Sequence, residues 1–458
     1  MQSDVPSANR PQLPPLKIAS RVGVVLGIIV FIGLLLLLLF PGPLVNIFIK
    51  PRVTKALAKA YPAYSVHIGA MSYSVFTNRM RFDSVAVGTI SGAFSSNLSS
   101  VSVSRMDWMH LLWKGSPATG DLAGSVMDAQ NIVLNIPKSH YELRCERLHI
   151  SVADSEIVVE AAKLHPSHDD EEFFAGSIFR RNRYSLIVPY ARVLGVACIE
   201  LLKGKNYRAR SVQIRDAFLD VLTNMDKLPV NDNSSPPMPN EILSSIKGTL
   251  QIDSLSIANG RLHYGERYTI DSMPALVTFD SVQVLAKGIA NHGDRGADIV
   301  IHAEGTFMKA GTMTLLMTFP VASPEFSFQY SGSLSSMDIG ALNSYTEPAD
   351  QIRIKTGVLQ SASFEINVVS GRASGSVRAV YKDLNLAVIS KHTGSAKGLF
   401  RGISSSYINI VKVRGTNMPD NSGSMKMGEV KYVRKRNDPF FAFAWFALFS
   451  GIQDAMVH

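Results

Sequence analysis

The sequence predicts a mainly β protein that is held to a membrane by one N-terminal helix, and three patterns support this prediction. A run of apolar residues, VGVVLGIIVFIGLLLLLLF, extends from Val22 to Phe40. From about residue 64 onward, short segments alternate apolar and polar residues, as half-buried strands do. An aromatic and apolar stretch, PFFAFAWFALFSGI, follows at Pro439 to Ile452. We therefore expect antiparallel β-sheets, few helices and a short apolar helix at the C-terminus.

The run from Val22 to Phe40 is long enough to cross a hydrocarbon core of about 30 Å as a helix. A cleaved signal peptide is the alternative, but its apolar region is shorter, about 7 to 15 residues, and ends in small residues. This run meets Pro41, Gly42 and Pro43 instead. We interpret it as a retained anchor that follows a tail at 1–21. Basic residues lie on both sides of it, so that charge leaves its orientation open.

The segment 41–62 mixes apolar residues with cations. This composition is typical of a helix that lies along a bilayer surface, and Pro51 is expected to break it. The formal charge of +9 comes from scattered Lys and Arg residues. On an anchored chain, such a charge favours contact with anionic headgroups over binding of nucleic acid.

A first strand-rich region is predicted at 63–228. Its alternating segments are Val66/Ile68, Val85/Val87, Val101/Val103, Ile132/Leu134/Ile136 and Ile157/Val159. The segment 229–240 is rich in Pro, Asn and Ser, which indicates a linker or a long loop. A second strand-rich region is predicted at 241–438. Its clearest alternation places Met313, Leu315, Met317, Phe319 and Val321 on one face of a strand.

The stretch 439–458 is predicted to be an apolar helix too short to cross a bilayer. It has to bury its side chains in the sheet core, in a membrane interface or against a partner. If it binds a partner, the docking candidates are Phe440, Phe441, Trp445 and Phe449.

The sequence contains none of the common catalytic motifs, so that we expect neither an enzyme nor a cofactor. The strongest metal candidate is His165 and His168 followed by four acidic residues, 169–172. The same composition describes a solvated loop, and we favour the loop because no further group of ligands accompanies it. Cys145 and Cys198 are the two cysteines, and one disulfide bond between them stays possible.

Several segments in a fixed order resemble the AsmA-like envelope proteins, in a branch catalogued as a domain of unknown function. They are NYRARSVQIRDAFLDVLTNMDKLP from Asn206, IKGTLQIDSLSIANGRLHYGER after the Pro-rich break, FSFQYSGSLSSMDIGALN (326–343), IRIKTGVLQSASFEI (352–366), ASGSVRAVYKDLNLAVI (373–389) and the closing aromatic stretch.

This resemblance implies a single-pass protein of a bacterial inner membrane, with the bulk of the chain in the periplasm. It also implies curved sheets that form a groove and that bind or pass phospholipid without catalysis. Met313, Leu315, Met317, Phe319 and Val321 are the candidate lining of the groove. The chain is short for a carrier of this kind. The alternative is a structural or assembly factor that docks an envelope protein, and the oligomeric state stays open.

Overall fold

The structure is a computed structural model, and it describes residues 28, 30–31, 45–106, 108, 119–202, 204, 206–228, 235–270, 272–292, 297–321, 326–389 and 413–457. Within these residues, eighteen strands join into one sheet. The first nine are β1 (Tyr64–Ser74), β2 (Arg79–Thr89), β3 (Ser95–Ser104), β4 (Val126–Ile136), β5 (Tyr141–Ser151), β6 (Glu156–Pro166), β7 (Asn182–Leu194), β8 (Asn206–Arg215) and β9 (Phe218–Asn224).

The other nine strands include the longest ones. They are β10 (Thr249–Arg267), β11 (Ala275–Ala290), β12 (Asp298–Phe307), β13 (Gly311–Pro320), β14 (Phe328–Leu334), β15 (Met337–Asp338), β16 (Ile352–Val369), β17 (Arg372–Val388) and β18 (Gly428–Val433).

The described helices are short, apart from α3 near the N-terminal end of the sheet and α11 at the other end. They are η1 (Val45–Ile49), α3 (Lys50–Ala60), α5 (Thr119–Leu122), η2 (Pro137–Ser139), α6 (Asp170–Ala175), α7 (Cys198–Leu202), α8 (Pro239–Ser245), η3 (Ile339–Leu342), α9 (Asn343–Asp350) and α11 (Phe440–Met456).

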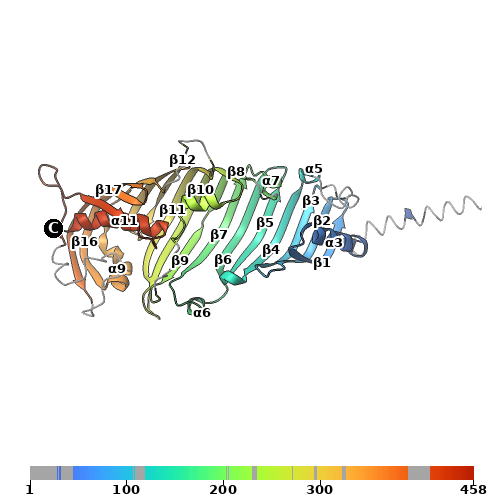
Figure 1. Cartoon of the computed structure of the whole chain (residues 1–458), viewed down its shortest axis with the longest axis horizontal. Helices are drawn as coiled ribbons and strands as arrows, with labels where there is room; N and C mark the ends of the chain where they lie inside the picture. The colour runs from blue at the N-terminus through green and yellow to red at the C-terminus, as the bar shows by residue number, and fades with distance from the viewer. Residues whose placement is uncertain are drawn as a thin grey trace, which may run out of the picture.

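The strands are arranged in the order of the sequence. Each strand from β1 to β7 pairs antiparallel with the next, and the same holds from β10 to β14 and from β16 to β18. In Figure 1 the strands follow one another along the long axis, from α3 at one end to α11 at the other. At about 4.8 Å between neighbouring strands, the row is roughly 70 Å long.

The two predicted strand-rich regions, 63–228 and 241–438, share this sheet. β7 pairs antiparallel with β8 and β9, and both of these run parallel to β10. A parallel pair needs a connection that crosses from one end of the strands to the other. The segment between β9 and β10 makes this crossing, and α8 lies at its end. The predicted linker, 229–240, is part of this connection, and its residues 229–234 lie outside the described part of the chain.

A line of interruptions crosses the sheet at mid-strand. The pairing skips Ser84 in β2, Asn131 in β4 and Ala161 in β6, and each of these residues has a positive φ (53°, 48° and 51°). Asp216 and Asn259 continue the line, and Asn259 Nδ2 donates a hydrogen bond to Asp216 Oδ1 at 2.6 Å. Interruptions of this kind bend a strand and increase its twist, and we attribute the curvature of the sheet to their alignment.

At each interruption the alternation of the side chains shifts by one residue. On β1, Ile68 and Met71 face the same side although they are three residues apart, because an interruption lies between them. Their partners on β2, Val85 and Phe82, lie on either side of the interruption at Ser84. The apolar residues before and after the interruption therefore stay on one face, which is continuous across the sheet.

The N-terminal and C-terminal expectations have different outcomes. The apolar helix predicted at 439–458 is confirmed as α11. Pro51 lies in the first turn of α3, which begins at Lys50 directly after the π-helix η1. The helical segment therefore changes type next to Pro51 and does not end there, because a proline in the first turn lacks only an N–H that has no intrahelical acceptor. The anchor, Val22 to Phe40, lies outside the described residues apart from positions 28, 30 and 31. Among the described residues, no helix has the length and hydropathy needed to span a membrane.

Candidate functional site

The candidate site is the apolar face of the sheet between β4 and β10. Six leucines lie directly opposite one another on successive strands and form the leucine row: Leu134, Leu143, Leu164, Leu186, Leu219 and Leu262. A second set, the aliphatic row, crosses the same strands on the other side of the interruptions: Met127, Ile150, Ile157, Val193, Val212 and Leu255. We call the two rows together the open stretch.

The side chains of the open stretch are half-buried, and none of them is fully covered. They do not belong to the buried clusters at the two ends of the sheet. Since apolar residues normally gain stability by burial, two rows that the described part of the chain leaves incompletely buried form an extended apolar surface of the kind that marks a binding site.

The opposite face of the same strands is polar. Glu142 lies between Asn135 and His165, and Asp220 lies between Ser185 and His263. Asp128 accepts hydrogen bonds from His149 and Arg147, at 2.9 and 3.0 Å. Burial acts to raise the pKa of Asp128, but these two donors outweigh it and the pKa is lowered. The sheet therefore presents one apolar and one solvated face.

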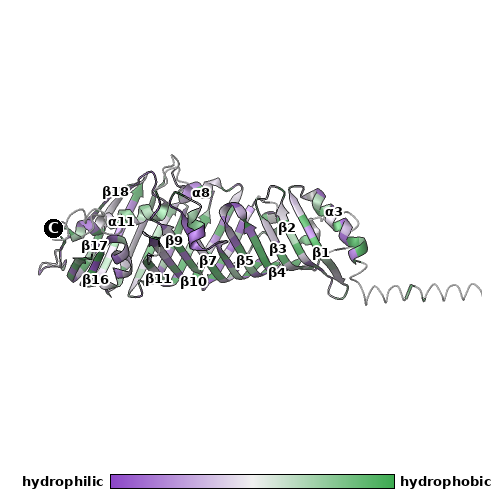
Figure 2. Cartoon of the chain, turned by 90° about the horizontal axis from the view of Figure 1, so that it is seen from below, coloured by the Kyte–Doolittle hydropathy of each residue, from purple (hydrophilic) through white to green (hydrophobic). Residues whose placement is uncertain are grey.

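At the N-terminal end, η1 and α3 cover the apolar face of β1 to β3. Val53 and Leu57 of α3, one helical turn apart, pack against a buried cluster that contains Ile68, Met71 and Met80. Figure 2 shows α3 and α11 at opposite ends of the row of strands.

At the C-terminal end, α11 covers the apolar face of β13 to β18. Its Phe443 and Ala447 are fully buried against Phe328, Ile366 and Val430. The hydroxyl of Tyr330 donates to the carbonyl of Ala444 at 2.7 Å, and burial raises the pKa of Tyr330. The backbones of α11 and β18 nearly touch, because a Cβ on Gly428 of β18 would lie 1.9 Å from the carbonyl oxygen of Gly451.

The residues predicted to line a groove lie at this covered end. Met313, Leu315, Met317 and Phe319 are on the apolar face of β13, but Met317 is 6% exposed and packs in the cluster under α11. Phe319 stacks on Phe328, 5.4 Å between ring centroids, and also contacts Phe440. Val321 follows the strand and is half-buried. Leu315, Met317 and Phe319 thus belong to the packed cluster under α11, whereas Met313 packs in a neighbouring cluster.

The four docking candidates on α11 differ in accessibility. Phe440 packs against the buried cluster and Phe449 is buried. Phe441 is 82% exposed and Trp445 is partly exposed, with its ring stacked on that of Phe449. A partner can therefore reach only Phe441 and Trp445 of this set.

Both outer edges of the sheet have backbone groups that are bonded to helices. On β18, the N–H of Glu429 donates to Asp454 (2.9 Å) and the N–H of Lys431 donates to Ser450 (3.3 Å), both on α11. On β1, the Asn46 side chain bonds to both the N–H and the C=O of Met71. An edge whose polar groups are bonded is a poor template for a further strand.

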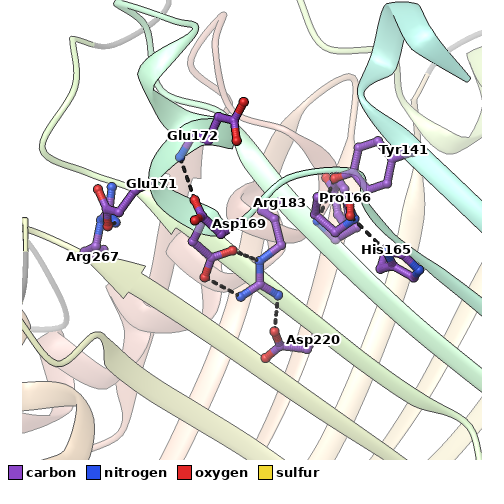
Figure 3. Close-up of polar contacts among 11 residues, drawn as sticks. Tyr141, His165, Pro166, Asp169, Glu171, Glu172, Arg183, Asp220 and Arg267 are labelled. Carbon is purple, nitrogen blue, oxygen red and sulfur yellow. Dashed lines mark hydrogen bonds and ion pairs between the residues drawn. The ribbon is translucent and has the colours of Figure 1, made fainter.

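A cluster of ion pairs fastens α6 to one rim of the sheet (Figure 3). Arg183 donates to both oxygens of Asp170, at 2.9 and 3.1 Å, and also to Asp220. Arg267 pairs with Glu171. These five residues line an open cavity of about 280 Å³, and every charged group in the lining has its partner in the lining. We therefore assign the cluster a structural role.

The two histidines of the predicted metal site have different partners in the fold. His168 pairs with Glu172 at 3.1 Å, while His165 points to Glu142 at 3.5 Å. In the part of the chain that the structure describes, no group of three or more His, Cys, Asp or Glu residues is placed to hold a metal ion. Cys145 and Cys198 are free, and burial raises the pKa of both thiols, which keeps them protonated and weakly nucleophilic.

A half-buried carboxylate joins α9 to β10. Glu266 accepts hydrogen bonds from the hydroxyls of Tyr264 (2.8 Å), Tyr345 (3.0 Å) and Tyr268. Burial, together with the negative charge of Glu266, raises the pKa of all three tyrosines. The three hydroxyls therefore stay protonated donors, and they fasten this rim of the sheet.

The leucine row was not predicted as a site from the sequence, although Leu134 lies in a predicted strand. The available signal was the recurrence of an apolar position at a fixed place in successive segments, and the shift at each interruption obscures it. No protein-family model matches the chain, and no curated protein is significantly similar to it. The resemblance to AsmA-like proteins stays a prediction from the sequence.

Proposed function

We propose that this chain is a membrane-anchored, non-enzymatic carrier that holds phospholipid acyl chains on the open stretch of its sheet. The observation that carries the proposal is the register of the two rows, which leaves aliphatic side chains incompletely buried on every strand from β4 to β10. In this proposal the sheet curves around its apolar face. Following the resemblance, we take the inner membrane of a double-membrane bacterium as the location, with the sheet in the periplasm.

The size of the open stretch suits an acyl chain. From β4 to β10 it extends over roughly 25 Å, whereas the chains of one leaflet occupy about half of a 30 Å core. Burial of one methylene stabilises by about 0.8 kcal/mol. Because the surface is equally aliphatic from strand to strand, a bound chain loses little free energy when it moves along the rows.

The polar face, and the helices that cover the two ends of the sheet, support the same function. A headgroup stays in water at the rim while the chains lie on the apolar face. The helices α3 and α11 cover the apolar face at the two ends, so that the uncovered area is limited to the middle of the sheet.

The test is mass spectrometry of lipids that remain with the purified full-length chain. The variant L143Q/L164Q changes two members of the leucine row, and the control E142Q/K163Q changes their neighbours on the polar face of the same strands. We expect phospholipid in the parent and the control and a loss of about tenfold or more in the leucine variant. Equal lipid in all three proteins, or none above an unrelated membrane protein, contradicts the proposal.

A second candidate function is the docking of an envelope protein on α11, and the exposure of Phe441 favours it. Addition of a partner strand is disfavoured, because both outer edges have backbone groups bonded to helices. If docking is the function, F441S abolishes co-purification of one defined protein, while L143Q/L164Q leaves that interaction unchanged.

A further inference from the structure

Large apolar side chains are exposed at the β1 end of the sheet. Ile47 and Phe48 lie on η1, and Val75 and Phe76 form the turn between β1 and β2. Phe48 is 61% exposed and Phe76 is 86% exposed. Exposure of such side chains to water is unfavourable, and a group of them at one end of the molecule indicates a surface that contacts another molecule or a membrane.

The position of η1 is fixed by hydrogen bonds to β1. The Asn46 side chain bonds to the N–H and the C=O of Met71, both at 2.8 Å, and Lys50 Nζ donates to the carbonyl of Gly69. As residue numbers rise along η1, they fall along β1. The end of η1 at Val45 therefore faces the turn that contains Val75 and Phe76.

The sequence before Val45 indicates what covers these exposed side chains. The apolar run ends at Phe40, and the Cα atom of Phe40 is no more than about 18 Å from that of Val45, even if the connection is fully extended. A bilayer that holds the run must therefore lie beside η1. The exposed cations Arg52, Lys55 and Lys59 lie on α3, and residues 45–60 include no acidic side chain. Cations next to exposed aromatic and aliphatic residues are typical of an interface with anionic lipid.

We propose that Ile47, Phe48, Val75 and Phe76 form a membrane-contacting surface that inserts into the headgroup region of the same bilayer that holds the N-terminal run. This inference rests on the anchor in the proposed function. It adds an orientation, because the β1 end of the sheet is seated on the membrane and the row of strands extends away from it.

The test uses the full chain with Cys145 and Cys198 replaced by alanine, in lipid nanodiscs that contain anionic phospholipid. A single cysteine at Phe48→Cys or Phe76→Cys has an environment-sensitive fluorophore attached, and nitroxide-labelled lipid serves as the quencher. The matched control is Val433→Cys. Val433 is 57% exposed and ends β18, which lies at the other end of the row of strands, roughly 70 Å from β1.

We expect the nitroxide lipid to reduce the fluorescence at positions 48 and 76 by about twofold or more and to leave position 433 unchanged. If the chain remains in the nanodisc and all three positions are equally unquenched, the anchor stands and the membrane-contacting surface is wrong. If the chain does not remain with the nanodisc, the anchor fails, and this surface fails with it. Retained lipid tests the carrier function independently of both outcomes.

Discussion

The middle and the C-terminal end of the sheet have the same alternation of apolar residues but different surroundings. Between β4 and β10, the side chains of the leucine and aliphatic rows are incompletely buried. Between β13 and β18, residues at equivalent positions, such as Ile366 and Val368, are fully buried because α11 lies on them. An apolar strand face is thus a core where a helix covers it and a candidate binding surface where none does. The substitutions below test that difference.

The largest loss of stability is expected for a substitution in the cluster under α11. Ile366→Asn places an amide in a fully packed cluster and removes apolar contacts, which should cost about 4 kcal/mol or more. Leu164→Asn makes the same kind of change in the incompletely buried leucine row and should cost about 1 kcal/mol. Urea unfolding, followed by far-ultraviolet circular dichroism, measures both. Equal losses in the two variants would mean that the middle of the sheet is also a packed core.

The next largest loss of stability is expected at the contact between α11 and the sheet. Gly451→Val puts a side chain where Val377 and Val430 already lie within 2.7 Å of a Cβ position, and should cost about 3 kcal/mol. Hydrogen exchange should then become faster in β17 and β18 and stay unchanged in β5 and β6. The matched control is Gly176→Val at the end of α6, where a Cβ would meet nothing within 4 Å. A parent-like Gly451→Val protein contradicts the packing of α11.

A smaller effect depends on pH. The folded pKa of Asp128 is lowered, so that its contribution to stability is present above the unfolded value of about 3.9 and is lost as the pH falls through the folded value. Asp128→Asn should therefore be less stable than the parent at pH 7, and the difference should shrink at acid pH. Thermal unfolding at a series of pH values checks this, and parallel curves for the two proteins argue against it.

The smallest effect is expected at the solvated ion pair of Arg144 and Glu142. The Arg144 side chain is 60% exposed. Arg144→Ala should change the free energy of unfolding by less than about 0.5 kcal/mol and leave retained lipid unchanged. A loss of lipid in this variant would show that the polar face takes part in binding.

Much of the secondary structure could be predicted from local pattern. Ile132/Leu134 and Ile157/Val159 lie on the apolar face of β4 and β6, and the aromatic C-terminal stretch is a helix. The predicted segments were too short, because the shift at residues such as Asn131 and Ala161 ends the regular alternation while the strand continues. A positive φ at a non-glycine residue has no reliable signal in one sequence.

The placement of the site could not be predicted in the same way. The alternation at Met313 and Met317 is clear in the sequence, but whether it faces lipid or protein depends on α11, more than one hundred residues later in the chain. Likewise, the parallel pairing of β10 with β8 and β9 joins two regions across a Pro-rich segment. Both are long-range contacts, whereas periodicity reports only local geometry.

The most direct test of the carrier function is site-specific photocrosslinking in living bacteria that produce the full chain. A photoreactive phenylalanine derivative replaces either Leu164, in the leucine row, or Lys163, its neighbour on the polar face. The account predicts phospholipid adducts at position 164 and none at position 163. Protein adducts at position 164, or equal lipid labelling at both positions, would contradict the claim that the open stretch holds acyl chains.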